Sequence, residues 1–170
     1  NVNAEPDFTA AGSYRFVSGA EGDVAVGGLA SEAAAKSVTV CVRCCNATGT
    51  AVRRWTVRYA VEKYRNGLAG CAVRLLVSRD GNVWQPAGRA TSFAADADMN
   101  GFPPESCPGE TVTEEQTVAL TEPGAPGGVF HLAWQYAVTE GEATGNAQAL
   151  GIDDVEITPV FAGTCVLTIR

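Results

Sequence analysis

The sequence predicts an all-β protein, an antiparallel two-sheet jelly-roll sandwich with an extra strand at its C-terminal end. Apolar and polar residues alternate with a period of two in several segments, which is typical of strands with one buried face. Gly, Pro, Asn and Asp cluster between those segments, where turns are expected. The chain has 170 residues, of which 46% are hydrophobic. This length suffices for one domain that buries about 70% of its unfolded surface.

Four segments show the alternation most clearly, and they are residues 36–45, 53–65, 71–78 and 129–139. In the second segment the apolar face begins at Trp55 and Val57. The opposite face carries charged side chains, namely Arg54, Arg58 and Glu62. The pair Asp80-Gly81 follows the third segment and is a strong signal for a β-hairpin.

Several motifs occur in an order that points to a family. An N-x-T-G turn occupies residues 46–49, a long strand ends in E-x-aromatic-R-N-G at residues 62–67, and G-I-D-D-V occupies residues 151–155. Together they resemble extracellular jelly-roll domains of bacterial secreted and surface proteins, which are similar to lectin-like and MAM-like sandwiches. The resemblance covers residues 14–158. It implies a fold and a location, but no particular activity.

This resemblance divides the chain into three parts. Residues 1–13 form an N-terminal arm, residues 14–159 form the jelly-roll sandwich, and residues 160–170 form a C-terminal strand. No internal repeat and no linker splits the chain further.

Charge and cysteine content narrow the function class. The net charge of −7 argues against nucleic-acid binding, which needs basic patches, and against binding to an anionic membrane surface. No apolar run approaches the roughly 18 residues of a membrane-spanning helix. An even number of cysteines suits an oxidising compartment. We therefore expect a secreted or cell-surface protein.

The six cysteines are expected to form disulfides. They are Cys41, Cys44, Cys45, Cys71, Cys107 and Cys165. The C-x-x-C at residues 41–44 lacks the second such pair that a structural zinc site needs. Cys44 and Cys71 both belong to inward faces and are one candidate pair, but the sequence leaves the connectivity open.

The segment D-A-D-M-N-G at residues 96–101 has the spacing of a calcium loop. Asp96, Asp98 and Asn100 alternate before a glycine, as in the first half of an EF-hand loop. An EF-hand needs a glutamate at the twelfth position, where Cys107 stands. Two interpretations remain, a calcium site completed by ligands from elsewhere and a polar turn. No other cofactor is expected.

The sequence does not predict catalysis. His131 is the single histidine and falls on an outward strand face, and no G-x-S-x-G nucleophile elbow is present. Asp153 and Asp154 are neighbours in a strand, so their side chains point to opposite faces and cannot flank one glycosidic bond. We expect Asp153 to point inward, where hydrogen bonds or a cation such as Arg65 would compensate its charge.

The C-terminal segment favours a structural or adhesive function. Residues 164–169 are apolar on both faces, so a strand formed by them is expected to be buried on both sides. Its main apolar residues are Val166, Leu167 and Ile169. This strand either folds back onto its own sandwich, held by Cys165, or inserts into a neighbouring subunit and builds a self-assembling surface filament.

The alternative function is carbohydrate binding. The outward side chains of residues 53–65, together with an aromatic residue, would offer a glycan a polar surface with a stacking platform. The proposed ligand surface consists of Arg54, Arg58, Glu62 and Trp84.

Overall fold

The computed structural model describes residues 12–18, 23–30, 37–102, 106–140 and 147–161. Ten strands and no α-helix occur in these residues. The strands are β1 (Gly12–Ser18), β2 (Asp23–Leu29), β3 (Ser37–Cys45), β4 (Val52–Arg65), β5 (Cys71–Ser78), β6 (Trp84–Pro86), β7 (Thr91–Phe93), β8 (Glu110–Gly124), β9 (Val129–Val138) and β10 (Ala149–Val160). Within the same residues, no helix is long and apolar enough to cross a membrane.

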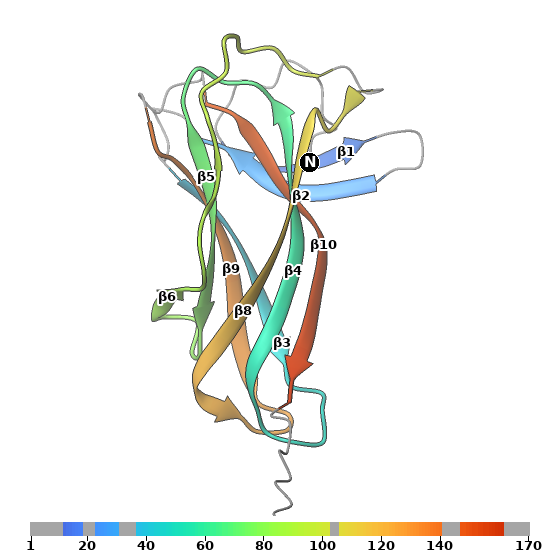
Figure 1. Cartoon of the computed structure of the whole chain (residues 1–170), viewed down its shortest axis with the longest axis vertical. Helices are drawn as coiled ribbons and strands as arrows, with labels where there is room; N and C mark the ends of the chain where they lie inside the picture. The colour runs from blue at the N-terminus through green and yellow to red at the C-terminus, as the bar shows by residue number, and fades with distance from the viewer. Residues whose placement is uncertain (1–11, 19–22, 31–36, 103–105, 141–146, 162–170) are drawn as a thin grey trace, which may run out of the picture.

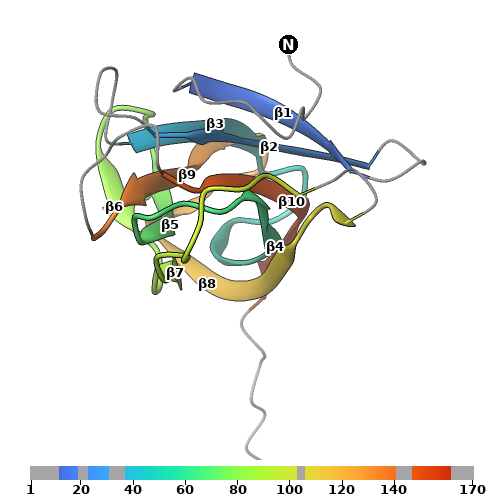
Figure 2. The same cartoon turned by 90° about the horizontal axis from the view of Figure 1, so that it is seen from above.

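The strands form two antiparallel sheets that pack face to face (Figure 1). The first sheet has the order β1-β2-β10-β4-β8, and the second has the order β3-β9-β5-β6, with β7 also paired to β5. Seen from above, β1 and β2 lie on one side of the molecule and β8 on the other (Figure 2). The predicted class, an all-β antiparallel two-sheet sandwich of jelly-roll type, is confirmed.

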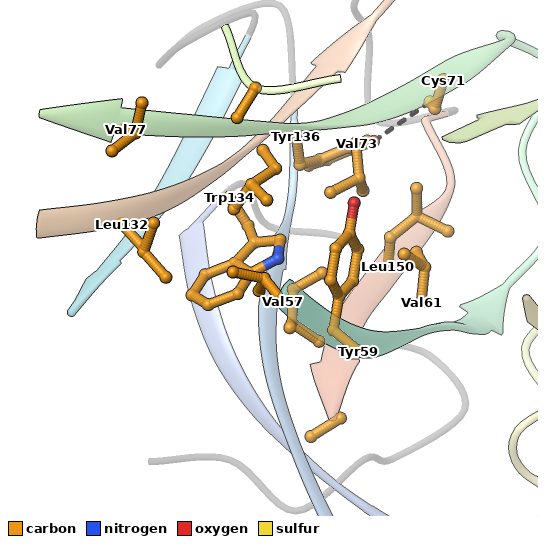
Figure 3. Close-up of a cluster of buried hydrophobic side chains, with 14 of the residues drawn as sticks. Val57, Tyr59, Val61, Cys71, Val73, Val77, Leu132, Trp134, Tyr136 and Leu150 are labelled. Atoms are coloured by element: carbon orange, nitrogen blue, oxygen red, sulfur yellow. Dashed lines mark hydrogen bonds between the residues drawn. The ribbon is translucent and has the colours of Figure 1, made fainter. Parts of the chain in front are cut away.

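The core lies between β4 of the first sheet and β9 of the second. Val57 and Tyr59 point from β4 toward Leu132 and Trp134 of β9 (Figure 3). The rings of Tyr59 and Trp134 meet edge to face, with 5.7 Å between their centroids. The inward faces predicted for residues 53–65 and 129–139 are therefore the buried faces, because alternate side chains of a strand share one side of the sheet.

The first sheet curls so strongly that part of its outer face is also buried. Phe16 of β1 stacks on Tyr64 of β4, with ring centroids 4.4 Å apart, although two strands lie between them in the sheet. Gly151 of β10 permits this contact, because a Cβ there would lie 2.7 Å from the Ala25 side chain and 3.0 Å from Phe16. The alternation in residues 53–65 cannot reveal this second buried layer.

The predicted N-x-T-G turn is anchored by Asn46, which is 1% exposed. Its amide nitrogen donates to the carbonyls of Gly124, Thr50 and Ala125 at 2.8, 2.9 and 3.2 Å. Its amide oxygen accepts from the backbone and the hydroxyl of Thr48. The asparagine thus joins the loop after β3 to the end of β8, and its side chain is fully engaged within the fold.

Candidate functional site

The ligand surface predicted from the sequence is divided between the two sheets. Arg54, Arg58 and Glu62 belong to β4 of the first sheet, whereas Trp84 begins β6 of the second. Trp84 therefore shares no face with the other three residues.

The outer face of β4 has the character of a solvated strand face. Arg58 lies opposite Glu115 of β8 and Glu156 of β10, so its neighbours carry the complementary charge. Glu62 is 7% exposed and sits in the curled part of the sheet. A ligand on this face would meet arginines with carboxylates at the neighbouring cross-strand positions, and no partly exposed tryptophan.

The outer face of the second sheet gathers the residue types that a glycan site needs. Arg43, His131, Ser78 and Trp84 are successive cross-strand neighbours on β3, β9, β5 and β6. Four residues farther along β9, a second row brings Thr39, Gln135 and Arg74 together. Strand partners at paired positions point to the same side of a sheet, so these side chains share one surface. We call it the Trp84 face, defined by Thr39, Arg43, Arg74, Trp84, His131 and Gln135.

The indole of Trp84 is supported from the side. The His131 ring approaches it edge-on, with 6.4 Å between the ring centroids. Trp84 is partly exposed, whereas Trp55 and Trp134 are 5% and 2% exposed and belong to the core. Of the three tryptophans, Trp84 is thus the one that presents ring surface to solvent.

The hairpin that carries Trp84 is closed by a network centred on Asp80. Asp80 Oδ1 accepts the N–H groups of Asn82 and Val83 at 2.8 and 3.0 Å and the Ser78 hydroxyl at 3.1 Å. These hydrogen bonds lower the pKa of Asp80 to about 2. Gly81 has a φ of 78°, which favours glycine. The predicted Asp80-Gly81 hairpin is confirmed, and it holds Trp84 in a fixed position.

Sequence reasoning missed Arg43, Arg74 and Gln135 as candidate ligand contacts. A signal for them was present in the sequence. Because Asp80-Gly81 closes a hairpin between residues 71–78 and Trp84, Trp84 must join the sheet of Arg74 rather than that of Arg58. Alternation then places Arg74 and Trp84 on the same side.

The predicted calcium motif forms a network with the protein's own N–H groups. Asp96 Oδ1 accepts from Lys63 Nζ at 3.0 Å, and its Oδ2 accepts from Gly67 N and Gln148 Nε2 at 3.0 and 2.8 Å. The neighbouring carboxylate, Asp98, accepts from Asn66 Nδ2 at 2.9 Å. Lys63 thus supplies a cation to Asp96. Calcium binding by Asp96, Asp98 and Asn100 remains a prediction.

Asp153 neither points inward nor pairs with Arg65: it lies on the outer side of the sheet with Glu62, and its Oδ1 accepts the backbone N–H of Asp154 at 2.8 Å, which is the hydrogen-bonded alternative. Asp153 lies opposite Ala60 and Arg65 lies opposite Ala149, so the two are separated along β4, and Arg65 Nη1 donates to the Ala147 carbonyl. Asp154 has a φ of 51° at a shift in the strand register. A β-bulge at this point turns the chain.

Asp153 instead joins two other carboxylates. Asp23, Glu62 and Asp153 each place a carboxylate oxygen within 4.8 Å of the others. Burial raises the pKa of Glu62, and the charges of Asp153 and Asp23 raise it further, while the hydrogen bond from Tyr64 opposes the shift. Burial likewise raises the pKa of Asp153. The folded state therefore holds protons on this cluster more tightly than the unfolded chain does.

We expect Glu62→Gln to stabilise the protein at pH 7. A carboxyl whose pKa is raised in the folded state stabilises the fold while it is protonated. That contribution is lost as the pH rises above 4.5, the ordinary pKa of a glutamate, toward the raised pKa. In urea unfolding at pH 7, the variant should have a higher free energy of unfolding than the native chain. This difference should shrink below pH 4.5. Glu115→Gln, at an exposed position on β8, is the control and should show no such gain. A loss of stability in Glu62→Gln at pH 7 would contradict the assignment.

The predicted disulfides do not form among the described cysteines. Cys41, Cys44, Cys45 and Cys71 form no disulfide with one another. Cys44 pairs with Phe130 at one end of β9 and Cys71 with Val138 at the other, eight positions along the strand. At about 3.3 Å per residue this separates them by about 26 Å, far beyond disulfide reach. The even cysteine count therefore does not support an oxidising compartment by itself.

The predicted assembly segment lies outside the described residues. It comprises Cys165, Val166, Leu167 and Ile169. The described chain ends just after β10, where Val160 is 37% exposed and Phe161 is 59% exposed. The first part of the predicted N-terminal arm, residues 1–11, also lies outside the described range, and Gly12 and Ser13 begin β1.

Known proteins resemble the chain in structure only. No family model and no curated protein matches the sequence. Among solved structures, the xylan-binding module CBM22-1 of Xyn10C from Paenibacillus barcinonensis has 15% identity and a TM-score of 0.46, covering 91% of this chain and 86% of that chain. A CBM28 module specific for non-crystalline cellulose has 9% identity and a TM-score of 0.45, covering 86% and 82%. TmCBM61 bound to β-1,4-galactotriose has 14% identity and a TM-score of 0.40, covering 92% and 86%. At these values the function must be inferred from the chain's own geometry.

Proposed function

We propose that this chain is a non-catalytic extracellular glycan-binding module whose ligand lies across the Trp84 face. The position of Trp84 carries the proposal. Its partly exposed indole is contacted from the side by His131, and the closed hairpin orders the backbone just before it, so less side-chain entropy is lost when a ligand stacks on it. Sugar rings present apolar C–H faces, which suit such a platform.

The polar residues around the indole complement the rim of a sugar ring. Arg43, Arg74 and Gln135 offer planar arrays of N–H donors on the same surface, and Gln135 also offers an acceptor. Hydroxyl groups both donate and accept. Trp84 lies on β6 at the edge of the sheet and the polar residues lie on the strands toward β3, so successive rings of a glycan chain, one of them stacked on Trp84, would find partners across the sheet. His131 contacts Trp84 and the Gly81 turn, which supports a positioning role rather than a chemical one.

We expect Trp84→Ala to weaken glycan binding at least tenfold, which corresponds to about 1.4 kcal/mol. Binding would be measured by affinity electrophoresis and calorimetry against xylan, β-1,4-galactan and polygalacturonate. Arg58→Ala, a change at an exposed position on the other sheet, is the control and should bind as the native chain does. Native affinity in Trp84→Ala, or a loss in Arg58→Ala, would move the site away from the Trp84 face.

A second candidate function is self-association through the C-terminal strand. The exposed apolar residues Val155, Val160 and Phe161 gather on the lower half of β10, whose free edge begins beyond Ile152, where pairing with β2 ends. An edge of this kind is a template for strand addition. Sedimentation of the full chain beside a chain ending at Phe161 tests this role. A full chain that stays monomeric at high concentration would exclude it.

A further inference from the structure

Charge is distributed unequally between the two sheets. The strands of the second sheet (β3, β5, β6, β7 and β9) contain two arginines, Arg43 and Arg74, and neither aspartate nor glutamate. The first sheet contains acidic residues on β2, β4, β8 and β10. In a chain with a net charge of −7, the outer face of the second sheet is therefore a locally cationic surface on an acidic molecule.

Neither arginine of that surface forms an ion pair with another described residue. Arg43 and Arg74 are exposed, and the ion pairs found among the described residues involve Lys63 and Arg89 instead. In the part of the chain that the structure describes, the carboxylates just beyond the ends of these strands include Asp80, whose Oδ1 is occupied within the hairpin turn, and Glu140 after β9. The two guanidinium groups thus remain available to an external anion.

The spacing of the arginines fits an extended ligand. Arg43 pairs with His131 and Arg74 pairs with Gln135, so the two lie two strands apart and four positions along the sheet. With about 4.8 Å between strands and 3.3 Å per residue, their Cα atoms are about 16 Å apart. This distance exceeds one sugar ring, so a chain that bears several anionic groups could contact both arginines while one of its rings covers Trp84.

We propose that the ligand of the Trp84 face is an anionic polysaccharide whose carboxylate or sulfate groups pair with Arg43 and Arg74. The inference rests on the proposed glycan-binding function and specifies its ligand class. The guanidinium fork matches both oxyanions through two parallel hydrogen bonds. The strands of the first sheet also carry exposed arginines, among them Arg54 and Arg58, but there they are accompanied by many carboxylates, whereas the strands of the second sheet contain none. A polyanion is therefore favoured on this face, and specificity follows from charge as well as from shape.

Matched polysaccharides test the ligand class. Polygalacturonate and its carboxyl-reduced neutral form differ in charge but share one backbone, and chondroitin sulfate tests whether sulfate serves as well as carboxylate. We expect the full chain to bind polygalacturonate at least tenfold more tightly than the reduced form, and to lose this preference at high ionic strength. Chondroitin sulfate also carries uronate carboxylates, so its chemically desulfated form is the matched comparison. A drop in affinity on desulfation would show that sulfate groups contribute to binding.

Paired double variants locate the interaction. R43Q/R74Q should lower affinity for polygalacturonate at least tenfold, whereas R54Q/R58Q on the first sheet should change it less than twofold. Equal affinity for charged and reduced polymer, or an unaffected R43Q/R74Q, would overturn the anionic ligand and leave glycan binding in place. Absence of binding to every polysaccharide would instead refute the proposed function itself. Circular dichroism of each variant confirms that the fold is intact.

Discussion

Replacing Trp134 by alanine is expected to lower the free energy of unfolding by about 3–5 kcal/mol. Trp134 lies in β9, between β3 and β5 in the second sheet, and it is 2% exposed. Its ring meets Tyr59 of the opposite sheet edge to face. Its loss leaves a cavity at the centre of the sandwich. The surrounding side chains cannot fill this cavity, because their backbones are fixed by the hydrogen bonds of the two sheets.

Urea denaturation followed by circular dichroism measures this loss. Trp84→Ala is the matched control, because it removes the same side chain from the partly exposed face of the same sheet, and it should cost about 1 kcal/mol or less. If Trp84→Ala proved as destabilising as Trp134→Ala, the division into a core tryptophan and a surface tryptophan would be wrong. If Trp84→Ala loses most of its glycan binding but keeps nearly native stability, Trp84 acts in binding and not in folding.

The second large effect is expected at Asp96. Asp96→Ala should cost about 3 kcal/mol, because it removes one partner of a largely buried pair. The Lys63 side chain is 6% exposed and would keep only Glu110, whose own side chain is 50% exposed. Gly67 N–H and the Gln148 amide would also lose their acceptor. Thermal and urea unfolding both report the loss.

Asp98→Ala provides the control for Asp96, since Asp98 is exposed and accepts from the Asn66 side chain, just after β4, and from the Asn100 N–H in its own loop. Its loss should cost less than about 1 kcal/mol. The same measurements with calcium and with a chelator separate the two interpretations of the motif. Equal losses in the two variants, present only with calcium, would show that the loop depends on calcium rather than on Lys63.

The alternation of apolar residues predicts the sandwich and its inward faces because one sheet face is buried along most of each strand. It fails at Glu62, which the pattern places in solvent. The curl that buries Glu62 depends on Gly151 and on the Phe16–Tyr64 stack, which are contacts between distant segments. A periodic pattern indicates which face of the sheet a residue lies on. It does not indicate whether other segments of the chain bury that face.

The misplacements at the candidate site have the same origin. Parity correctly places Cys44 and Cys71 on inward faces, but it gives no position along the shared strand β9, where they occupy opposite ends. The oxygen-rich turn of Asp96 is visible in the sequence, yet its cation comes from Lys63, far away in the chain. Trp84 was grouped with Arg58 because only the strand pairing decides which sheet each joins.

The most direct test of glycan binding at the Trp84 face uses the three tryptophan indoles as reporters. Each gives its own ¹H–¹⁵N signal in NMR, and single Trp→Phe variants assign the signals. On titration with polygalacturonate oligosaccharides, the Trp84 indole signal should shift together with the side-chain signals of Arg43 and Arg74, while those of Trp55 and Trp134 stay nearly unchanged. A saturating titration in which Trp84 does not move and the signals of Arg54 and Arg58 do would contradict the account.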